Sequence, residues 1–173
     1  MGGFCDAHHN SDRKVMTELK AMQARRVLPL AMLVVVRVAT AIDLAPNDEL
    51  VRGQTAVIVQ NGEQQSMNID QRGHANKAQA GQNGQEQSGD LRQTGRGNVA
   101  TLQQAGIDNN AQLDQAGIGN RMHVSQTGGG DQALVTQSGR DNRADITQTG
   151  SGLNVSVVQR GNGNRALVNQ GGR

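Results

Sequence analysis

The sequence predicts an all-β fold: a cross-β, amyloid-type β-solenoid built from 11-residue strand-turn units. The first observation is a Gln that recurs every eleven residues without a gap, at Gln60, Gln71, Gln82, Gln93, Gln104, Gln115, Gln126, Gln137, Gln148, Gln159 and Gln170. The second is a Gly two positions after each, at Gly62, Gly73, Gly84, Gly95, Gly106, Gly117, Gly128, Gly139, Gly150, Gly161 and Gly172. A fixed period kept this long is typical of stacked-repeat proteins.

Three further columns follow the same period. Five positions after the Gln stands an amide, at Gln65, Asn76, Gln87, Asn98, Asn109, Asn120, Asn142 and Asn164, with Asp131 and Leu153 as departures. Seven positions after it stands a small or apolar residue, although Gly89 leaves that position empty. Nine positions after it stands an aliphatic residue in nearly every unit. Apolar residues two apart fit a strand and do not fit a helix.

Each unit is predicted to be a strand and a tight turn, as in a strand over 98–104 and a turn over 105–108. Side chains alternate along a strand, so Asn98, Ala100, Leu102 and Gln104 share one face. This face repeats and must point inward, whereas the opposite face varies freely. The Gly at the second turn position indicates a backbone with positive φ.

Two strands and two turns give 22 residues, which we expect to form one rung. The eleven strand-like segments from 54–60 to 164–170 predict five to six rungs. The chain has one Phe, no Trp and no Tyr, so bulky side chains cannot fill a core. We expect each buried Gln and Asn to stack on its copy one rung away, where the amides satisfy each other.

The N-terminal region is predicted to be a targeting segment. Residues 1–15 are an unpatterned leader, and translation can start at Met16 or Met22. Residues 16–41 fit a signal peptide, with basic residues ahead of the apolar run 27–36 and small residues at 39–41. Ten apolar residues fall short of the roughly 20 that span a bilayer. The mature chain then begins near Ile42, with a lead-in over 42–53 and the repeats over 54–173.

Charge and cysteine content exclude several classes of function. Six of the 17 Lys and Arg and three of the 15 Asp and Glu lie in residues 1–41, which leaves eleven basic and twelve acidic residues. This balance argues against nucleic acid as a partner. The single Cys5 allows no disulfide within the chain, and His8 and His9 alone do not make a metal site.

No enzyme or cofactor site is predicted. Calcium-binding solenoids use a nine-residue Gly- and Asp-rich unit, and Asp108, Asp131 and Asp141 form no regular row of ligands. His74 and His123 have no partner constellation and are expected to be solvated. We therefore assign no catalytic residue, metal or cofactor.

The repeat has a specific family resemblance. The motif Gln-x-Gly-x-x-Asn-x-Ala-x-x-x-Gln stands intact at 93–104, and again at 71–82, 104–115, 137–148 and 159–170. It resembles the curlin repeat of bacterial curli fibres over about two thirds of the chain. The resemblance implies a secreted subunit of a functional amyloid, which joins other curlin subunits in a fibre on the outer surface of a Gram-negative-type bacterium. It also implies export through a dedicated outer-membrane machinery, and roles in biofilm matrix and adhesion.

Within that family, the chain is most similar to the minor, nucleating subunit. Its lead-in starts Asp43-Leu44-Ala45 and is not Gly-rich, and its repeats begin with a half-unit at 54–60. Its last unit is basic, with Arg160, Arg165 and Arg173, and the resemblance associates such a unit with membrane attachment and nucleation. A major-type self-assembling curlin and a soluble β-solenoid binding module remain as alternatives. Unpaired strand edges at both ends would template addition of further subunits.

Overall fold

The structure, a computed structural model, describes residues 34–41 and 53–172. Of the N-terminal segments, the leader 1–15, most of the predicted signal peptide and all of the lead-in except Gly53 lie outside the described residues. The described residues form twelve strands: β1 (Val34–Ala41), β2 (Gln54–Glu63), β3 (Ser66–His74), β4 (Lys77–Gln85), β5 (Ser88–Arg96), β6 (Val99–Ile107), β7 (Asn110–Ile118), β8 (Arg121–Gly129), β9 (Gln132–Arg140), β10 (Arg143–Ser151), β11 (Asn154–Asn162) and β12 (Arg165–Gly171). No helix of the described part is long and apolar enough to cross a membrane.

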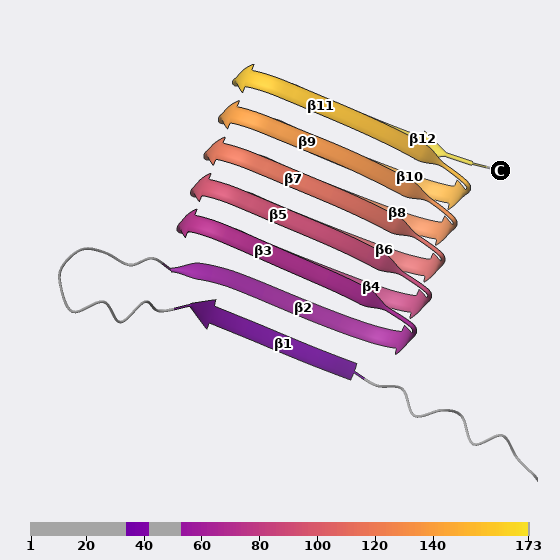
Figure 1. Cartoon of the computed structure of the whole chain (residues 1–173). Helices are drawn as coiled ribbons and strands as arrows, with labels where there is room; N and C mark the ends of the chain where they lie inside the picture. Colours follow the sequence, from indigo (N-terminus) through magenta and orange to yellow (C-terminus); the bar gives the residue numbers. More distant parts are fainter. Residues whose placement is uncertain (1–33, 42–52, 173) are drawn as a thin grey trace, which may run out of the picture. The chain divides into compact units, whose positions relative to one another are not determined.

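The strands form two parallel stacks, which confirms the predicted β-solenoid. Sheet A has the order β1-β2-β4-β6-β8-β10-β12, and sheet B has the order β3-β5-β7-β9-β11. From β2 onward, neighbouring strands of a sheet are parallel and pair at a shift of 22 residues, as in Gln82 with Gln104. The chain thus alternates between the sheets, and the strands of sheet A run opposite to those of sheet B (Figure 1).

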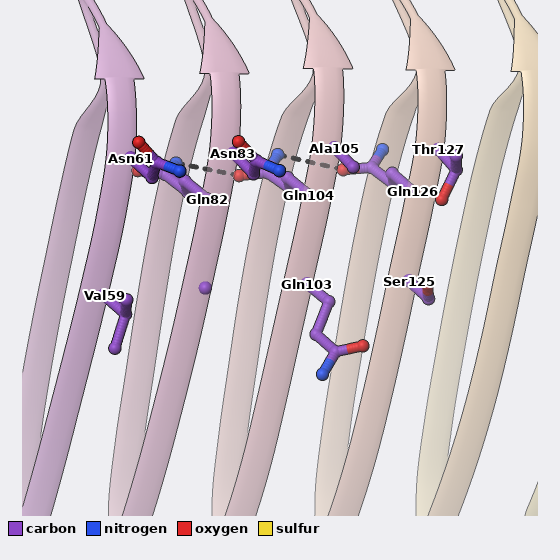
Figure 2. A pocket seen from close by; sticks show the side chains of 11 residues that line it. Val59, Asn61, Gln82, Asn83, Gln103, Gln104, Ala105, Ser125, Gln126 and Thr127 are labelled. Atoms are coloured by element: carbon purple, nitrogen blue, oxygen red, sulfur yellow. Dashed lines mark hydrogen bonds between the residues drawn. The ribbon is translucent and has the colours of Figure 1, made fainter. Parts of the chain in front are cut away.

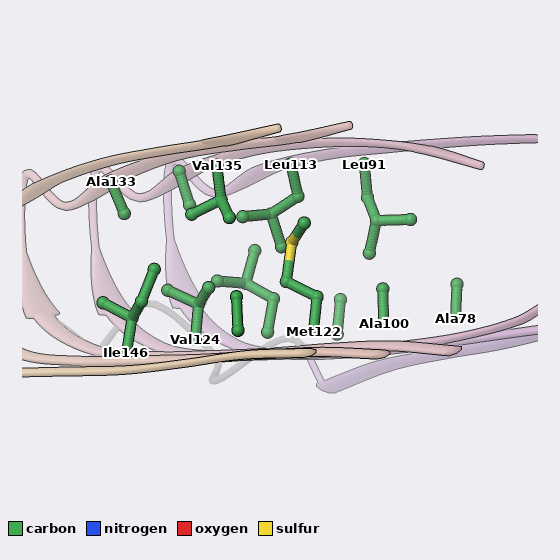
Figure 3. Packing of buried hydrophobic residues seen from close by; sticks show 13 residues of the cluster. Ala78, Leu91, Ala100, Leu113, Met122, Val124, Ala133, Val135 and Ile146 are labelled. Carbon is green, nitrogen blue, oxygen red and sulfur yellow. The ribbon is translucent and has the colours of Figure 1, made fainter. Parts of the chain in front are cut away.

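The repeating face of each strand does point inward. The small and aliphatic columns form a thin core between the sheets, in which Ala100, Leu102, Leu113, Val124 and Ile146 are almost fully buried. Figure 3 shows these short side chains reaching toward each other from the two sheets. A Cβ at Gly89 would meet the sulfur of Met67, so that side chain fills the space that the sequence left empty.

The turns are shorter than the sequence predicted. Strand β6 starts one residue after Asn98 and continues through Gly106 to Ile107, so only Asp108 and Asn109 separate it from β7. The predicted boundaries were wrong because the Gly still pairs with the strand below and above, Gly84 and Gly128. The regularly spaced Gly therefore lies near the end of each strand, and the residue of the amide column lies in the turn.

The Gly column is required by the stacking of one rung on the next. Its backbone has positive φ from Gly62 to Gly161, as in Gly106 with φ of 117°. A Cβ on Gly106 would also overlap the carbonyl oxygen of Gly128 in the next rung. Only a residue without a side chain satisfies both demands.

Strand β1 differs from all the others. It pairs antiparallel with β2, from Val34 opposite Asn61 to Ala41 opposite Gln54, and β2 is its one neighbour in sheet A. It lies within the segment 16–41 that the sequence predicts to be a signal peptide. Every pairing from β2 to β12 is independent of β1, so its removal leaves the parallel solenoid complete and uncovers the edge of β2.

A Gly of this column should tolerate no side chain. We expect Gly106→Ala to lower the free energy of unfolding of polypeptide 42–173 by at least about 2 kcal/mol, because strained backbone and overlap with Gly128 both act against it. Gly81→Ala is the matched control, since an added Cβ there meets no atom within 4 Å. Urea unfolding of freshly desalted monomer, followed by circular dichroism, measures both. Equal effects of the two changes would refute the role of the Gly column.

Candidate functional site

The Gln column forms two continuous hydrogen-bonded ladders along the solenoid axis. From Gln60 to Gln148, each Gln Nε2 donates to the Oε1 of the Gln 22 residues later, at 2.7–3.0 Å, with examples at Gln82–Gln104 and Gln104–Gln126 (Figure 2). Even-numbered strands carry one ladder and odd-numbered strands the other. The Gln side chains of the interior rungs are at most 2% exposed. Buried hydrogen bonds of this kind are shielded from water.

The second hydrogen of each Gln amide ties the two sheets together. Gln104 Nε2 in sheet A also donates to the carbonyl oxygen of Ser88 in sheet B, at 3.0 Å. The same bond to the residue 16 positions earlier recurs from Gln71 onward, as in Gln115 to Val99 and Gln137 to Arg121. Each interior Gln therefore uses both of its donors and accepts one bond, which satisfies a buried amide.

The Asn column acts differently from the amide ladder that we expected. Asn98 Nδ2 donates to the carbonyl oxygens of Thr94 and Gly117, each at 3.1 Å. Its Oδ1 accepts from the backbone N–H of Asn120 at 3.1 Å. An amide-to-amide bond joins Asn142 to Asn120. The short Asn side chain thus holds the turn closed and ties it to the next rung through backbone groups.

The departures from Asn leave gaps in this network. Gln65 and Gln87 are one methylene longer, and the Oε1 of each is buried without a hydrogen-bond partner. Asp131 is fully buried; its Oδ1 accepts from the N–H of Leu153 at 2.9 Å, but its Oδ2 has no partner. A carboxylate oxygen cannot donate to the carbonyls that the Asn amide nitrogen binds in other rungs.

A second backbone column escaped the sequence analysis. The residue just before each position of the amide column, including the departures Asp131 and Leu153, has φ between 53° and 70°, at Gln64, Ala75, Glu86, Gly97, Asp108, Gly119, Gly130, Asp141, Gly152 and Gly163. Half of these positions are Gly and two are Asp, which was a visible signal at four residues after each Gln. The predicted turn over 105–108 centres on Gly106, whereas the turn in the structure is 108–109, so this column was not recognised.

A surface depression and the histidines of the described residues bear on the sequence expectation that no catalytic site is present. An open depression on sheet A is lined by Val59, Asn61, Gly81, Gln82, Asn83, Gln103, Gln104, Ala105, Ser125, Gln126 and Thr127, which include no acid, base or thiol (Figure 2). His74 ends β3, and His123 lies in β8 beside Asp145 of β10. Within the described residues, no group of three or more His, Cys, Asp or Glu could hold a metal ion.

The two ends of the solenoid carry unpaired groups of opposite kind. At one end, Gln60 Oε1 and Gln71 Oε1 accept no bond from a described residue, although both residues donate up their ladders. At the other end, Gln159 and Gln170 donate only to the backbone oxygens of Arg143 and Asn154.

The core is open at these ends as well. Met67 and Ile69 of β3 are only partly buried, as are Val155, Val157, Ala166 and Val168 of β11 and β12. The interior members of the same columns are at most 4% exposed. Each end therefore exposes apolar side chains together with hydrogen-bond donors or acceptors that have no ladder partner.

Charges segregate to opposite long edges, despite their balanced total. The turns that lead from sheet B to sheet A also contain the exposed Asp141, but they are flanked mainly by exposed cations: Arg72, Lys77, Arg96, Arg121, Arg140, Arg143, Arg160 and Arg165. Arg72 pairs with Asp70, and Arg143 with Asp145, at 2.9 and 2.7 Å. The hydrogen bond that Arg143 donates to Asp145, with the charge of that carboxylate, raises the pKa of Arg143.

The turns that lead from sheet A to sheet B carry acids instead. Glu63, Glu86 and Asp108 are exposed there, and residues 61–66, 83–88, 105–110, 127–132 and 149–154 include no Lys, Arg or His. We call the two sides the basic edge and the acidic edge. Of the cations singled out from the sequence, Arg160 and Arg165 continue the basic edge, and Arg173 lies outside the described residues.

An Asn at position 131, as in most other units of the amide column, should stabilise the solenoid. We expect Asp131→Asn to raise the free energy of unfolding by about 1–3 kcal/mol, since the new amide nitrogen can donate where Oδ2 now has no partner. Asp114→Asn makes the same change of charge on an exposed side chain of β7 and should shift stability by less than about 0.5 kcal/mol. Urea unfolding at neutral pH compares them; a loss of stability in Asp131→Asn would contradict this account of the turn.

Comparison with known proteins agrees with the architecture. The model of the curlin associated repeat matches residues 86–117 and 120–150. Neither a curated protein nor a solved structure shows significant similarity to the chain. The matched segments cover β5, β6, β8 and β9 completely and all but the last residue of β7 and β10, and the same ladders continue beyond them on both sides. The central rungs of the solenoid, over residues 86–117 and 120–150, are therefore similar to the curlin associated repeat, and the remaining rungs share the same Gln and Gly columns.

Proposed function

We propose that this protein is a structural subunit of an extracellular, curli-type amyloid fibre, and that it is the minor subunit that nucleates polymerisation at the cell surface. The curlin associated repeat supports a fibre subunit of this type. The fibre would contribute to biofilm matrix and surface adhesion. No catalytic residue, metal or cofactor has a part in this function.

The complementary ends of the solenoid are the observation that carries the proposal. Among the described residues, the ladder acceptors of Gln60 and Gln71 receive no hydrogen bond at one end, and Gln159 and Gln170 donate to no further Gln at the other. When a second copy stacks head to tail, the Gln donors of one copy can bond to the Gln acceptors of the other. Two like ends would instead place donor against donor or acceptor against acceptor. Stacking also buries the partly exposed core side chains of the end rungs.

In this proposal the repeat columns have distinct roles in the fibre. The Gln column continues its ladders from subunit to subunit, the Asn column closes the turns, and the Gly column allows close stacking of rungs. Edges of parallel sheets that lack a covering element are templates for strand addition. The exposed charges of the turns, such as Arg96 and Asp108, would slow uncontrolled association.

Secretion would precede assembly. A signal peptide over 16–41 would direct export, and its removal would take away β1, which pairs with the edge of β2. The chain from Ile42 would then leave through the outer-membrane curli secretion machinery, with 42–53 as its lead-in. Keeping β1 until export would keep one of the two complementary ends covered.

The nucleating role rests on the resemblance of the lead-in and of the basic last unit to the minor curlin. A major-type curlin that assembles without seeding others is the second candidate. It is favoured by the same complementary ends, because they would equally support a homopolymer.

The first test is assembly of purified polypeptide 42–173 at low micromolar concentration, followed by thioflavin-T fluorescence. We expect a rapid rise, and a shorter lag when the product is added to a fresh major curlin. The full chain 1–173 should assemble more slowly, since β1 covers the edge of β2. Assembly without seeding would favour a major-type subunit. A flat trace from a folded, β-rich monomer would refute the fibre and favour a soluble binding solenoid.

The basic edge is proposed to hold the fibre at an anionic membrane surface through Arg160 and Arg165, together with Arg173. Each surface cation contributes about 1 kcal/mol toward anionic lipid. We therefore expect the double change Arg160→Glu and Arg165→Glu to weaken binding to phosphatidylglycerol vesicles at least about tenfold, as measured by co-sedimentation. The double change Arg96→Glu and Arg121→Glu alters the net charge equally. If both double variants lose vesicle binding equally, the whole basic edge makes the contact. If neither variant loses binding, the proposed membrane contact is refuted.

A further inference from the structure

The two sheets of the solenoid contain unequal numbers of repeat strands. Sheet A has seven strands, of which β1 is not a repeat strand, and sheet B has five. The repeat strands at both ends of the solenoid, β2 and β12, therefore belong to the same sheet. This inequality restricts how one copy of polypeptide 42–173 can continue another.

Simple translation along the axis leaves a gap. If β2 of the next copy lies on β12, sheet A is continuous, but β3 of that copy lies two strand spacings from β11, roughly 9.6 Å away. One strand is then missing from sheet B at every joint. The free donor of Gln159 and the free acceptor of Gln71 face this gap and cannot reach each other.

Rotation of the next copy by about 180° around the axis closes the gap. The rotation exchanges the two sheets, which the molecule permits because sheet A strands run opposite to sheet B strands (Figure 1). It is also permitted by the 11-residue period, which places the same residue types on both sheets. Strand β2 of the next copy then lies on β11, and its β3 lies on β12.

The register of this joint is fixed by the 22-residue pairing shift. Gln159 faces Gln60 of the next copy, and Gln170 faces Gln71 of the next copy, so both ladders continue donor to acceptor. Val157 and Val168 reach the partly buried Ile58 and Ile69 of the next copy, which closes the core. Every open ladder group described at the two ends is filled by this one arrangement.

We propose that successive copies are related by a screw of about 180° along the fibre, with sheet A of one continuing as sheet B of the next. This inference rests on the proposed fibre. One consequence is that the basic and acidic edges alternate along each side. Another is the axial rise: eleven strands at half a rung each advance about 26 Å per copy, whereas translation needs six whole rungs, about 29 Å.

Cysteine pairs on the outer faces distinguish the two joints, and polypeptide 42–173 contains no cysteine of its own. Leu167 of β12 lies in register with Asn68 of the next copy in the rotated joint, and with Val57 of the next copy in the translated joint. Stacked neighbours are about 4.8 Å apart, within the reach of a disulfide. We expect fibres of Leu167→Cys with Asn68→Cys to oxidise to high oligomers on non-reducing gels, and fibres of Leu167→Cys with Val57→Cys to remain monomeric.

Two controls make the result decisive. Asp145 and Leu167 are register partners within one copy, so Asp145→Cys with Leu167→Cys must form an intramolecular disulfide under the same oxidation. Leu167→Cys alone gives dimers only if two like ends meet. Cross-linking through Val57, through both pairs equally, or through neither while the internal control oxidises, would overturn the screw and leave the fibre standing.

Electron microscopy of unmodified fibres provides a second measurement, free of substitutions. A rotation near 180° with a rise of about 26 Å per copy supports the screw, and a rise of about 29 Å without that rotation overturns it. Absence of any fibre from 42–173 would instead remove the proposed function and this inference together. The two failures are thus distinguishable.

Discussion

A buried side-chain amide that must find its partners one rung away is the constraint on which the rest of this structure depends. Each interior Gln donates to the next Gln and to a carbonyl of the opposite sheet, as Gln104 does with Gln126 and Ser88. A buried amide without partners would be costly. Since its partner is its own copy at a shift of 22 residues, every other position must keep the same period.

Stacking of identical units explains the unusual composition. Short side chains such as Ala100 and Ala144 suffice for the core, because the core between the sheets is thin. Backbone hydrogen bonds between rungs contribute much of the stability of the stack. Gly is required where the backbone of one rung meets the next, as at Gly106 and Gly128. The described end rungs lack a neighbour on one side, and in the proposed fibre another copy would supply it.

Deviations from the repeat occur at positions where a neighbouring rung still supplies a hydrogen-bond partner for the side chain or the backbone. Asp131 keeps one bond to Leu153 and leaves one oxygen without a partner. Gln65 and Gln87 likewise keep their donor bonds and lose an acceptor bond. The outer positions are free of this constraint, and there the charges divide into a basic and an acidic edge. Net charge therefore says little about what each side of the solenoid can bind.

The sequence by itself determined the period, the inward face, the Gln ladders and the 22-residue rung, because these follow from alternation along a strand and from repetition. It did not determine where the turn lies, since a Gly with positive φ fits both a turn and the end of a stacked strand. Only their contacts with neighbouring rungs show that Gly106 belongs to the strand and that Asn109 belongs to the turn. The pairing of β1 with β2, the segregation of charge and the unequal sheets are likewise tertiary. They depend on which turns share an edge and which strands share a sheet, and a linear pattern does not specify either.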